Sequence, residues 1–141
     1  MRTEPLPGKD GAEHSRHDTR LDDDARQNAF SIEIEILKSH RKVTFPAEAE
    51  ILFGRLDAAH GVFPEVDLTV EGGLESGVSR RHARIYAQQG AFHLEDLDST
   101  NSTFHNDERL TPYVPSELHD GDILMLGSMK IRIRIYNNNA V

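Results

Sequence analysis

The clearest regularity in this sequence is an alternation of apolar and polar side chains that starts at residue 30. Every second residue from 30 to 36 is Phe or Ile, and Ser31, Glu33 and Glu35 fill the positions between. Successive side chains of a strand point to opposite faces, so this pattern predicts a strand with one buried face. The same period returns near the C-terminus, where Ile131, Ile133 and Ile135 alternate with residues 132, 134 and 136. We therefore expect a domain that begins and ends with a strand.

Shorter runs rich in β-branched and aromatic residues fill the chain between these two strands. They cover residues 41–45, 51–54, 66–70, 82–87, 92–97 and 123–126. Turn-forming pairs such as Gly72-Gly73, Gln89-Gly90 and Asp120-Gly121 separate them. No segment shows the 3.6-residue apolar period of an amphipathic helix. Many short strands without helices predict an all-β fold, an antiparallel sandwich or barrel.

The N-terminal segment has a different composition from the rest of the chain. Residues 1–28 contain proline, glycine and many charges but few large apolar side chains. Such a segment buries too little surface to offset its conformational entropy, so we expect an acidic disordered tail. The 141 residues, 37% of them apolar, are enough for one core and too few for two. We expect one domain over residues 29–137 and a short C-terminal tail over 138–141.

Charge and composition exclude several classes of function. The 24 acidic and 16 basic residues give a net charge of −8, which argues against the basic footprint that nucleic-acid binding needs. The chain has no cysteine, which rules out disulfides and thiolate chemistry and favours a cytoplasmic setting. No stretch approaches the ~20 apolar residues of a membrane span. We expect no cofactor, no metal, and neither a nucleic acid nor a membrane as partner.

Three polar segments stand out against this background. Gly54-Arg55 comes first, residues 77–85 read GVSRRHARI, and residues 96–106 read DLDSTNSTFHN. They combine hydroxyls, an amide and guanidiniums, and arginine binds phosphate through paired hydrogen bonds. Arg80, Arg81 and Arg84, with Arg55, would form a basic patch on an acidic body. Because each segment lies where a predicted strand meets a loop, the set predicts a receptor for a phosphate on a peptide at one end of the sandwich.

The order of these motifs also resembles a known family. GR, SRRHA, DSTNSTFHN and a closing LHDGDILMLG follow one another as in a forkhead-associated (FHA) domain of the bacterial type, from roughly Ile32 to Tyr136. The resemblance implies a β-sandwich that binds phosphothreonine peptides through loops at one end. Its implied role is signal transduction by protein–protein interaction, with a phosphothreonine-containing protein, a substrate of a Ser/Thr kinase, as partner.

The resemblance further implies a role for each residue of the site. Arg55 would be the main phosphate ligand, Ser79, Arg80 and Thr100 would also bind the phosphate, and Asn101 would bind the peptide backbone beside it. Residues with a structural role would be Gly54, His82 and Asn106, and those at the rim would be Arg81 and Ser102. Two positions depart from the family pattern. Ser102 replaces a usual glycine, which tolerates positive φ, and Gly77 replaces an arginine that in some relatives reads the third residue after the phosphothreonine.

Two other classes of function compete with a phosphopeptide reader. An FHA-like scaffold could assemble proteins without recognising phosphate, although the complete set of site residues favours recognition. An enzyme is the other alternative, since Ser79, His82 and Asp96 could be drawn as a catalytic triad. However, no nucleophile elbow surrounds Ser79, and an oxyanion hole is not evident in the sequence. We predict that the protein is not an enzyme.

Overall fold

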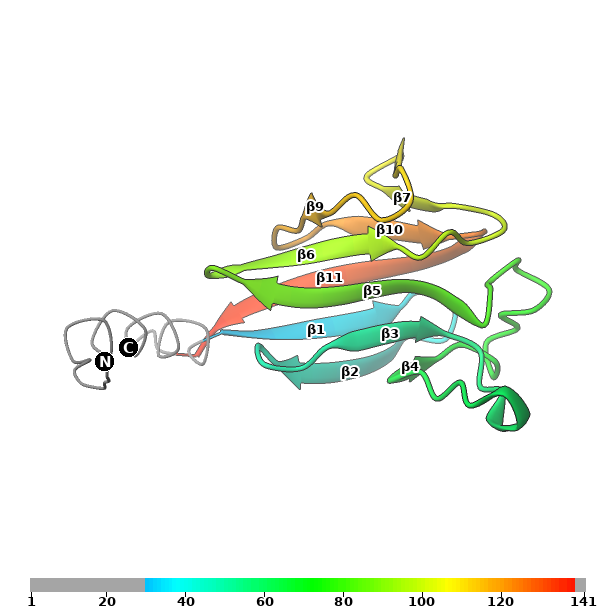
Figure 1. Cartoon of the computed structure of the whole chain (residues 1–141). Helices are drawn as coiled ribbons and strands as arrows, with labels where there is room; N and C mark the ends of the chain where they lie inside the picture. The colour runs from blue at the N-terminus through cyan, green and yellow to red at the C-terminus, as the bar shows by residue number, and fades with distance from the viewer. Residues whose placement is uncertain (1–29, 139–141) are drawn as a thin grey trace, which may run out of the picture.

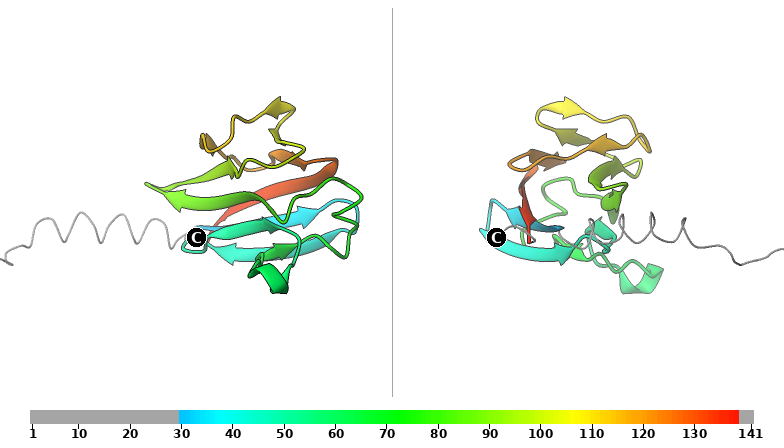
Figure 2. Two further views of the ribbon diagram at one scale, coloured as in Figure 1. Left: turned by 45° about the vertical axis from the view of Figure 1, so that its right-hand side comes forward. Right: turned by 90° about the vertical axis from the view of Figure 1, so that its left-hand side faces the viewer.

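The computed structural model describes residues 30–138 as two β-sheets packed face to face (Figure 1). The first sheet contains, in spatial order, β2 (Arg41–Pro46), β1 (Phe30–Ile36), β11 (Met129–Asn137), β10 (Ile123–Leu126), β7 (Thr103–His105) and β8 (Glu108–Arg109). The second contains β4 (Val66–Asp67), β3 (Ile51–Gly54), β5 (Arg81–Gln88), β6 (Ala91–Asp96) and β9 (Ser116–Glu117). The turned views of Figure 2 show the two layers. The predicted all-β sandwich is confirmed.

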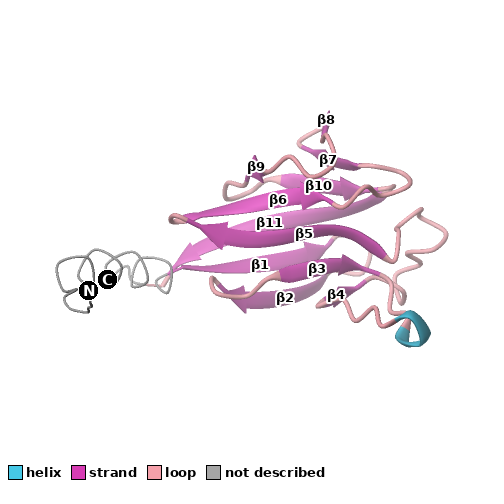
Figure 3. Ribbon diagram, in the orientation of Figure 1, coloured by secondary structure: helices cyan, strands magenta, loops and turns pink. Residues whose placement is uncertain are grey.

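Strand pairing is antiparallel throughout both sheets except at one edge. There β4 pairs with β3 in parallel, which the sequence did not predict. The connection between these two strands includes η1 (Ala58–His60), a single turn of 3₁₀-helix and the only helical segment within residues 30–138 (Figure 3). The predicted tail 1–28 lies outside the described residues. Within the part of the chain that is described, no helix is long and apolar enough to cross a membrane.

The core consists of the apolar side chains that the alternation predicted. Ile32, Ile34 and Ile36 of β1 are fully buried, and they stand opposite isoleucines of β11 in register. The second sheet contributes Ile51, Phe53, Ala83, Ile85 and Leu94, all of them also fully buried. Burial of one such Ile, Leu or Phe side chain stabilises the fold by roughly 1.5–3 kcal/mol. The two sheets and the core between them therefore form a rigid frame that positions the loops.

Strand bounds agree with the predictions where alternation is sustained and differ where the pairing is short. The predicted strand 66–70 ends at Asp67, because the Asp67 carboxylate accepts hydrogen bonds from the Thr69 N–H at 3.1 Å and hydroxyl at 2.6 Å and turns the chain. Val70 is accordingly 89% exposed. The strands β7, β8 and β9 were not predicted, since each has only two or three residues and no alternation.

The loops that carry the candidate site gather at one end of the sandwich. The connections β3–β4, β4–β5 and β6–β7 all lie at the right of Figure 1. The start of β1 and the end of β11 lie at the opposite end. The topology thus brings together segments that are far apart in the sequence.

Candidate functional site

Ser79 joins the two loops that the sequence singled out. Its hydroxyl oxygen accepts a hydrogen bond from the Thr100 N–H at 3.1 Å, so the β4–β5 and β6–β7 loops touch at this point. The Ser79 N–H donates to Nδ1 of His82 at 2.9 Å, which fixes the backbone of the loop. Because the hydroxyl accepts from Thr100, its own hydrogen can be donated to a ligand.

Arg55 reaches the same loop from the end of β3. A Cβ on Gly54 would lie 1.8 Å from the Arg80 carbonyl oxygen, so only glycine allows the two backbones to approach so closely. The Arg55 N–H donates to that carbonyl at 3.1 Å, and its Nε donates to the Val78 carbonyl at 2.6 Å. Within residues 30–138 the two terminal nitrogens of the guanidinium have no hydrogen-bond partner. They are available for an oxyanion, which a guanidinium binds best with two parallel N–H groups.

Arg80 has an acidic partner that sequence reasoning missed. Its Nε lies 2.8 Å from Oδ2 of Asp57, a residue of the β3–β4 loop, and Nδ1 of His60 lies 2.8 Å from the same oxygen. Desolvation would raise the pKa of Asp57, but the hydrogen bond from His60 and the charges of His60 and Arg80 together lower it. Asp57 is therefore anionic at neutral pH. The local sequence does not predict this ion pair, because the two residues lie in different loops.

Asn101 connects the second loop to the first through its side chain. Its Nδ2 donates to the Gly77 carbonyl at 3.0 Å, while the side chain itself remains exposed. Gly77 has a φ of +85°, and a Cβ there would lie 2.6 Å from Nδ2 of Asn101. The lack of a side chain at residue 77 thus lets the amide approach the loop. Within residues 30–138 the amide oxygen has no partner, so it can accept from a peptide N–H.

His82 is buried beneath the two loops and holds both. Its Nδ1 accepts from the Ser79 N–H, and its Nε2 donates to the Ser102 carbonyl at 2.9 Å. Burial lowers the pKa of His82 below its usual value, so the ring is neutral with its proton on Nε2. Both ring nitrogens are occupied by backbone groups, and neither is available as a base for the Ser79 hydroxyl. Ser102 itself has a φ of +70°, the conformation for which glycine is better suited.

Asp96 organises the loop that presents Thr100 and Asn101, a role that sequence reasoning did not assign. Its side chain is almost fully buried and accepts from the Ser99 hydroxyl at 2.5 Å and the Thr103 hydroxyl at 2.6 Å. It also accepts from the Ser99 N–H at 3.2 Å. An Asp that is followed closely by Ser at the end of a strand is a recognised turn pattern, and that signal was present in the sequence.

The basic patch is smaller than the sequence predicted. Arg84 forms ion pairs with Glu50 at 2.6 Å and Glu95 at 2.7 Å, so its charge is neutralised. Arg81 lines a hollow on the outer face of the second sheet. Asn106 accepts from the Ile123 N–H and donates to Asp122, both at 2.9 Å, and so closes its own turn. The cations near Ser79 are therefore Arg55 and Arg80.

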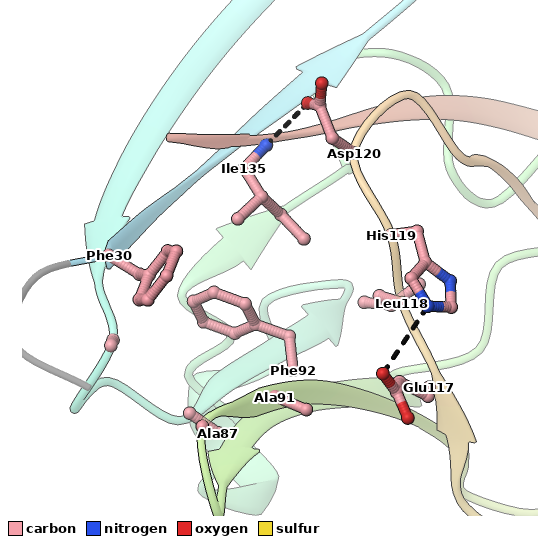
Figure 4. Close-up of a pocket in the computed structure, with 11 residues that line it drawn as sticks. Phe30, Ala87, Ala91, Phe92, Glu117, Leu118, His119, Asp120 and Ile135 are labelled. Atoms are coloured by element: carbon pink, nitrogen blue, oxygen red, sulfur yellow. Dashed lines mark hydrogen bonds and ion pairs between the residues drawn. The ribbon is translucent and has the colours of Figure 1, made fainter. Parts of the chain in front are cut away.

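A cavity of about 250 Å³ lies at the other end of the sandwich (Figure 4). Phe30, Phe92 and Ile135 line it, and its polar rim includes His119, which is 3.4 Å from Glu117. This lining is mostly apolar and offers no arginine or lysine for a phosphate. Among residues 30–138, no three His, Asp or Glu side chains are grouped so as to hold a metal ion.

Comparison with known sequences identifies relatives for part of the chain. The chain is 33% identical over 85 residues to the oxoglutarate dehydrogenase inhibitor of Corynebacterium diphtheriae, a match that covers 60% of this chain and 55% of that protein. It is 38% identical over 53 residues to an FHA domain-containing protein of Arabidopsis thaliana, covering 38% of this chain and 14% of that protein. A probable E3 ubiquitin-protein ligase of Schizosaccharomyces pombe is 38% identical over 55 residues, with 36% of this chain and 21% of the ligase covered. The chain thus spans only part of each relative.

Comparison with solved structures and with family models leads to the same family. An FHA domain studied for phosphothreonine-dependent interactions has a TM-score of 0.60 and 28% identity, over 75% of this chain and 97% of that domain. The FhaA FHA domain, solved in complex with the intracellular domain of another protein, has a TM-score of 0.56 and 28% identity, over 74% of this chain and 99% of its own. The model of the FHA domain matches residues 51–127, more than half of the sequence. The chain therefore belongs to the FHA domain family.

Proposed function

We propose that this domain binds phosphothreonine peptides without catalysis and so docks phosphorylated partner proteins. The observation that carries the proposal is the hydrogen bonding of the Arg55 guanidinium. Its Nε is held by the Val78 carbonyl at 2.6 Å, and its terminal nitrogens are open beside the Ser79 hydroxyl and the exposed Thr100. Fixed donors of this kind lose little entropy when they bind a phosphate. The similar FHA domain studied for phosphothreonine-dependent interactions supports the same function.

Each residue of the proposed site then has a distinct task. The terminal nitrogens of Arg55 bind two of the three terminal phosphate oxygens, and the Ser79 and Thr100 hydroxyls also donate to terminal oxygens. The Asn101 amide oxygen accepts from the peptide backbone while its nitrogen stays on Gly77. Arg80 contributes a further positive charge once a phosphate competes with Asp57 for it. Each hydrogen bond between charged groups is expected to contribute about 1.5–3 kcal/mol.

The test compares matched peptides by isothermal titration calorimetry. A peptide selected from a degenerate phosphothreonine library is titrated in three forms, with phosphothreonine, unmodified threonine or glutamate at the central position. We expect binding of the phosphothreonine form alone, because glutamate has one charge and a planar head. Arg55→Ala should weaken binding at least tenfold. Arg134→Ala, on the outer face of the first sheet, removes the same charge and should bind like the parent.

Two outcomes would overturn the proposal. Equal binding of the phosphorylated and unmodified peptides would favour the alternative, a scaffold that assembles proteins without phosphate recognition. Equal losses in Arg55→Ala and Arg134→Ala would show that general charge, and not a phosphate site, attracts the peptide.

The finer assignments rest on the sequence. Relatives come from a plant, a fission yeast and a bacterium, so the bacterial type of FHA domain stays a prediction. A cytoplasmic setting and a role in Ser/Thr kinase signalling are predictions from the sequence as well.

A further inference from the structure

A second surface with binding chemistry lies on the outer face of the second sheet, beside the β4–β5 and β6–β7 loops, which we call the phosphate loops. Leu52, Phe63, Arg81, Leu97 and Tyr113 line a hollow of about 570 Å³ there, which we call the aromatic groove. This face of the sheet is turned toward the viewer in Figure 1. Phe63 is 63% exposed and Tyr113 is 60% exposed, so neither ring is part of the core. Two large exposed rings on one hollow face are unusual for a surface that contacts only water.

The backbone holds Tyr113 in this exposed position against its own preference. Its φ is +65°, which is unfavourable for a residue with a bulky side chain. The Tyr113 N–H donates to the Asp96 carbonyl at 2.9 Å, and this contact fixes the strained conformation. Strain of this kind is concentrated at ligand-binding positions, and here it projects an aromatic ring over the groove.

Within residues 30–138, the aromatic groove has one cation without a carboxylate partner, Arg81, and one carboxylate without a cation, Glu65. Arg84 is neutralised by Glu50 and Glu95, and Arg84 also lies over the Tyr86 ring at 4.4 Å. The Glu65 carboxylate accepts from the Leu52 N–H at 2.7 Å. Arg81 is exposed and has no ion pair within residues 30–138. An unpaired arginine beside two aromatic rings is suited to a carboxylate that accompanies an apolar side chain.

The residues of the aromatic groove adjoin the phosphate loops along the chain. Arg81 follows Arg80 directly, Leu97 follows the Asp96 that organises the β6–β7 loop, and Phe63 shares the β3–β4 loop with Asp57. An extended peptide advances about 3.3 Å per residue, so six residues beyond a phosphothreonine span about 20 Å. A peptide held at the phosphate loops can therefore reach the groove in one continuous stretch.

We propose that the aromatic groove binds a second stretch of the same phosphorylated partner. An apolar or aromatic side chain of that stretch lies between Phe63 and Tyr113, and an acidic side chain pairs with Arg81. This inference rests on the proposed function, because the occupant is the partner that carries the phosphothreonine. The groove would add selectivity that the phosphate loops, which contact the residues nearest the phosphate, cannot supply.

The experiment is a selection from a library of peptides with a fixed phosphothreonine and six randomised positions on each side. The wild-type domain should enrich acidic residues, next to aromatic or large apolar residues, at positions remote from the phosphothreonine. Arg81→Glu should reverse the preference from acidic to basic at the same position, which a merely structural role would not produce. Phe63→Ser should abolish the aromatic preference. Arg134→Glu is the matched control and should select the same peptides as the wild type.

The remaining outcomes separate this proposal from the proposed function. The proposal for the aromatic groove would be overturned if the remote positions showed no residue preference, or if Arg81→Glu kept the acidic preference. Binding would still depend on phosphothreonine in either case. Equal capture of a library with unmodified threonine would instead overturn the proposed function itself, and the groove with it. Titration of one selected peptide should give an affinity at least fivefold lower for Arg81→Glu than for the wild type.

Discussion

The Asn101 side chain donates a hydrogen bond to the carbonyl oxygen of Gly77 at 3.0 Å. Together with the hydrogen bond from the Thr100 N–H to the Ser79 hydroxyl, this amide links the β4–β5 and β6–β7 loops. The contact depends on the missing side chain of residue 77, since a Cβ would lie only 2.6 Å from Nδ2 of Asn101.

Substitution of Gly77 should consequently weaken peptide binding. Gly77→Ala forces the Asn101 amide to move and also places alanine at a φ of +85°. The backbone part of this cost is roughly 1–2 kcal/mol of stability. We expect a lower melting temperature and at least tenfold weaker binding of a phosphothreonine peptide, measured by calorimetry.

Gly121, in the turn between β9 and β10, provides the control for the backbone cost. It has a φ of +90°, but a Cβ there meets no atom within 4 Å. Gly121→Ala should lower the melting temperature by a similar amount and leave affinity unchanged. A comparable loss of affinity in both variants would mean that backbone strain, and not displacement of Asn101, affects the peptide.

The sequence predicts those parts of the fold that depend on local alternation. The strand predicted over 123–126 has those bounds, and β1 begins at residue 30 as expected, because period-two burial and nearby turn residues are local signals. Strands β7 to β9 are too short to carry such a pattern. Their pairing arises only when the two sheets are assembled, so no window of sequence contains it.

The candidate site shows the same division. The loops that carry the motif residues Arg55, Ser79 and Asn101 meet, as expected of loops that connect strands at one end of a sandwich. The pairing of Arg80 with Asp57 could not be predicted, since two loops determine it. Alternation predicts that the Arg81 side chain points away from that of Arg80. The hollow that Arg81 lines could not be predicted, because residues from three other segments of the chain form it.

Ser102 should be a site where glycine stabilises the domain. Its φ of +70° is costly for a residue with a Cβ, and relief of that cost is worth roughly 1–2 kcal/mol. Glycine gains more entropy in the unfolded chain, which removes about 0.4–1 kcal/mol of this benefit. We expect Ser102→Gly to raise the melting temperature by a few degrees. Asp98→Gly, at a φ of +60°, should gain less because Asp tolerates this region better. A lower melting temperature in Ser102→Gly would contradict the inference that the backbone at Ser102 is strained.

His82 should make the stability of the domain depend on pH. Burial lowers its pKa, although the Ser102 carbonyl and the Asp96 charge oppose this, so the unfolded chain binds a proton more readily than the folded one. The stability that the neutral ring contributes is present above the unfolded pKa of about 6.5 and is lost as pH falls below it, by at most ~1.4 kcal/mol per pH unit. Thermal melts at pH 7.5 and 5.5 should show a larger drop for the wild type than for His82→Gln, whose amide does not titrate. Equal drops would show that another group causes the effect.

Removal of the Asp57 charge should strengthen phosphopeptide binding. Its carboxylate holds Arg80 at 2.8 Å and places a negative charge beside a site for an anion. Asp57→Asn keeps an oxygen that can accept from His60 but frees the guanidinium of Arg80 for the phosphate. We expect a roughly threefold to tenfold rise in affinity that diminishes in high salt. Glu48→Gln, in the β2–β3 connection at the opposite end of the sandwich, removes the same charge and should change affinity little. Weaker binding in Asp57→Asn would show instead that Asp57 positions Arg80 for the phosphate, and that the ion pair persists in the complex.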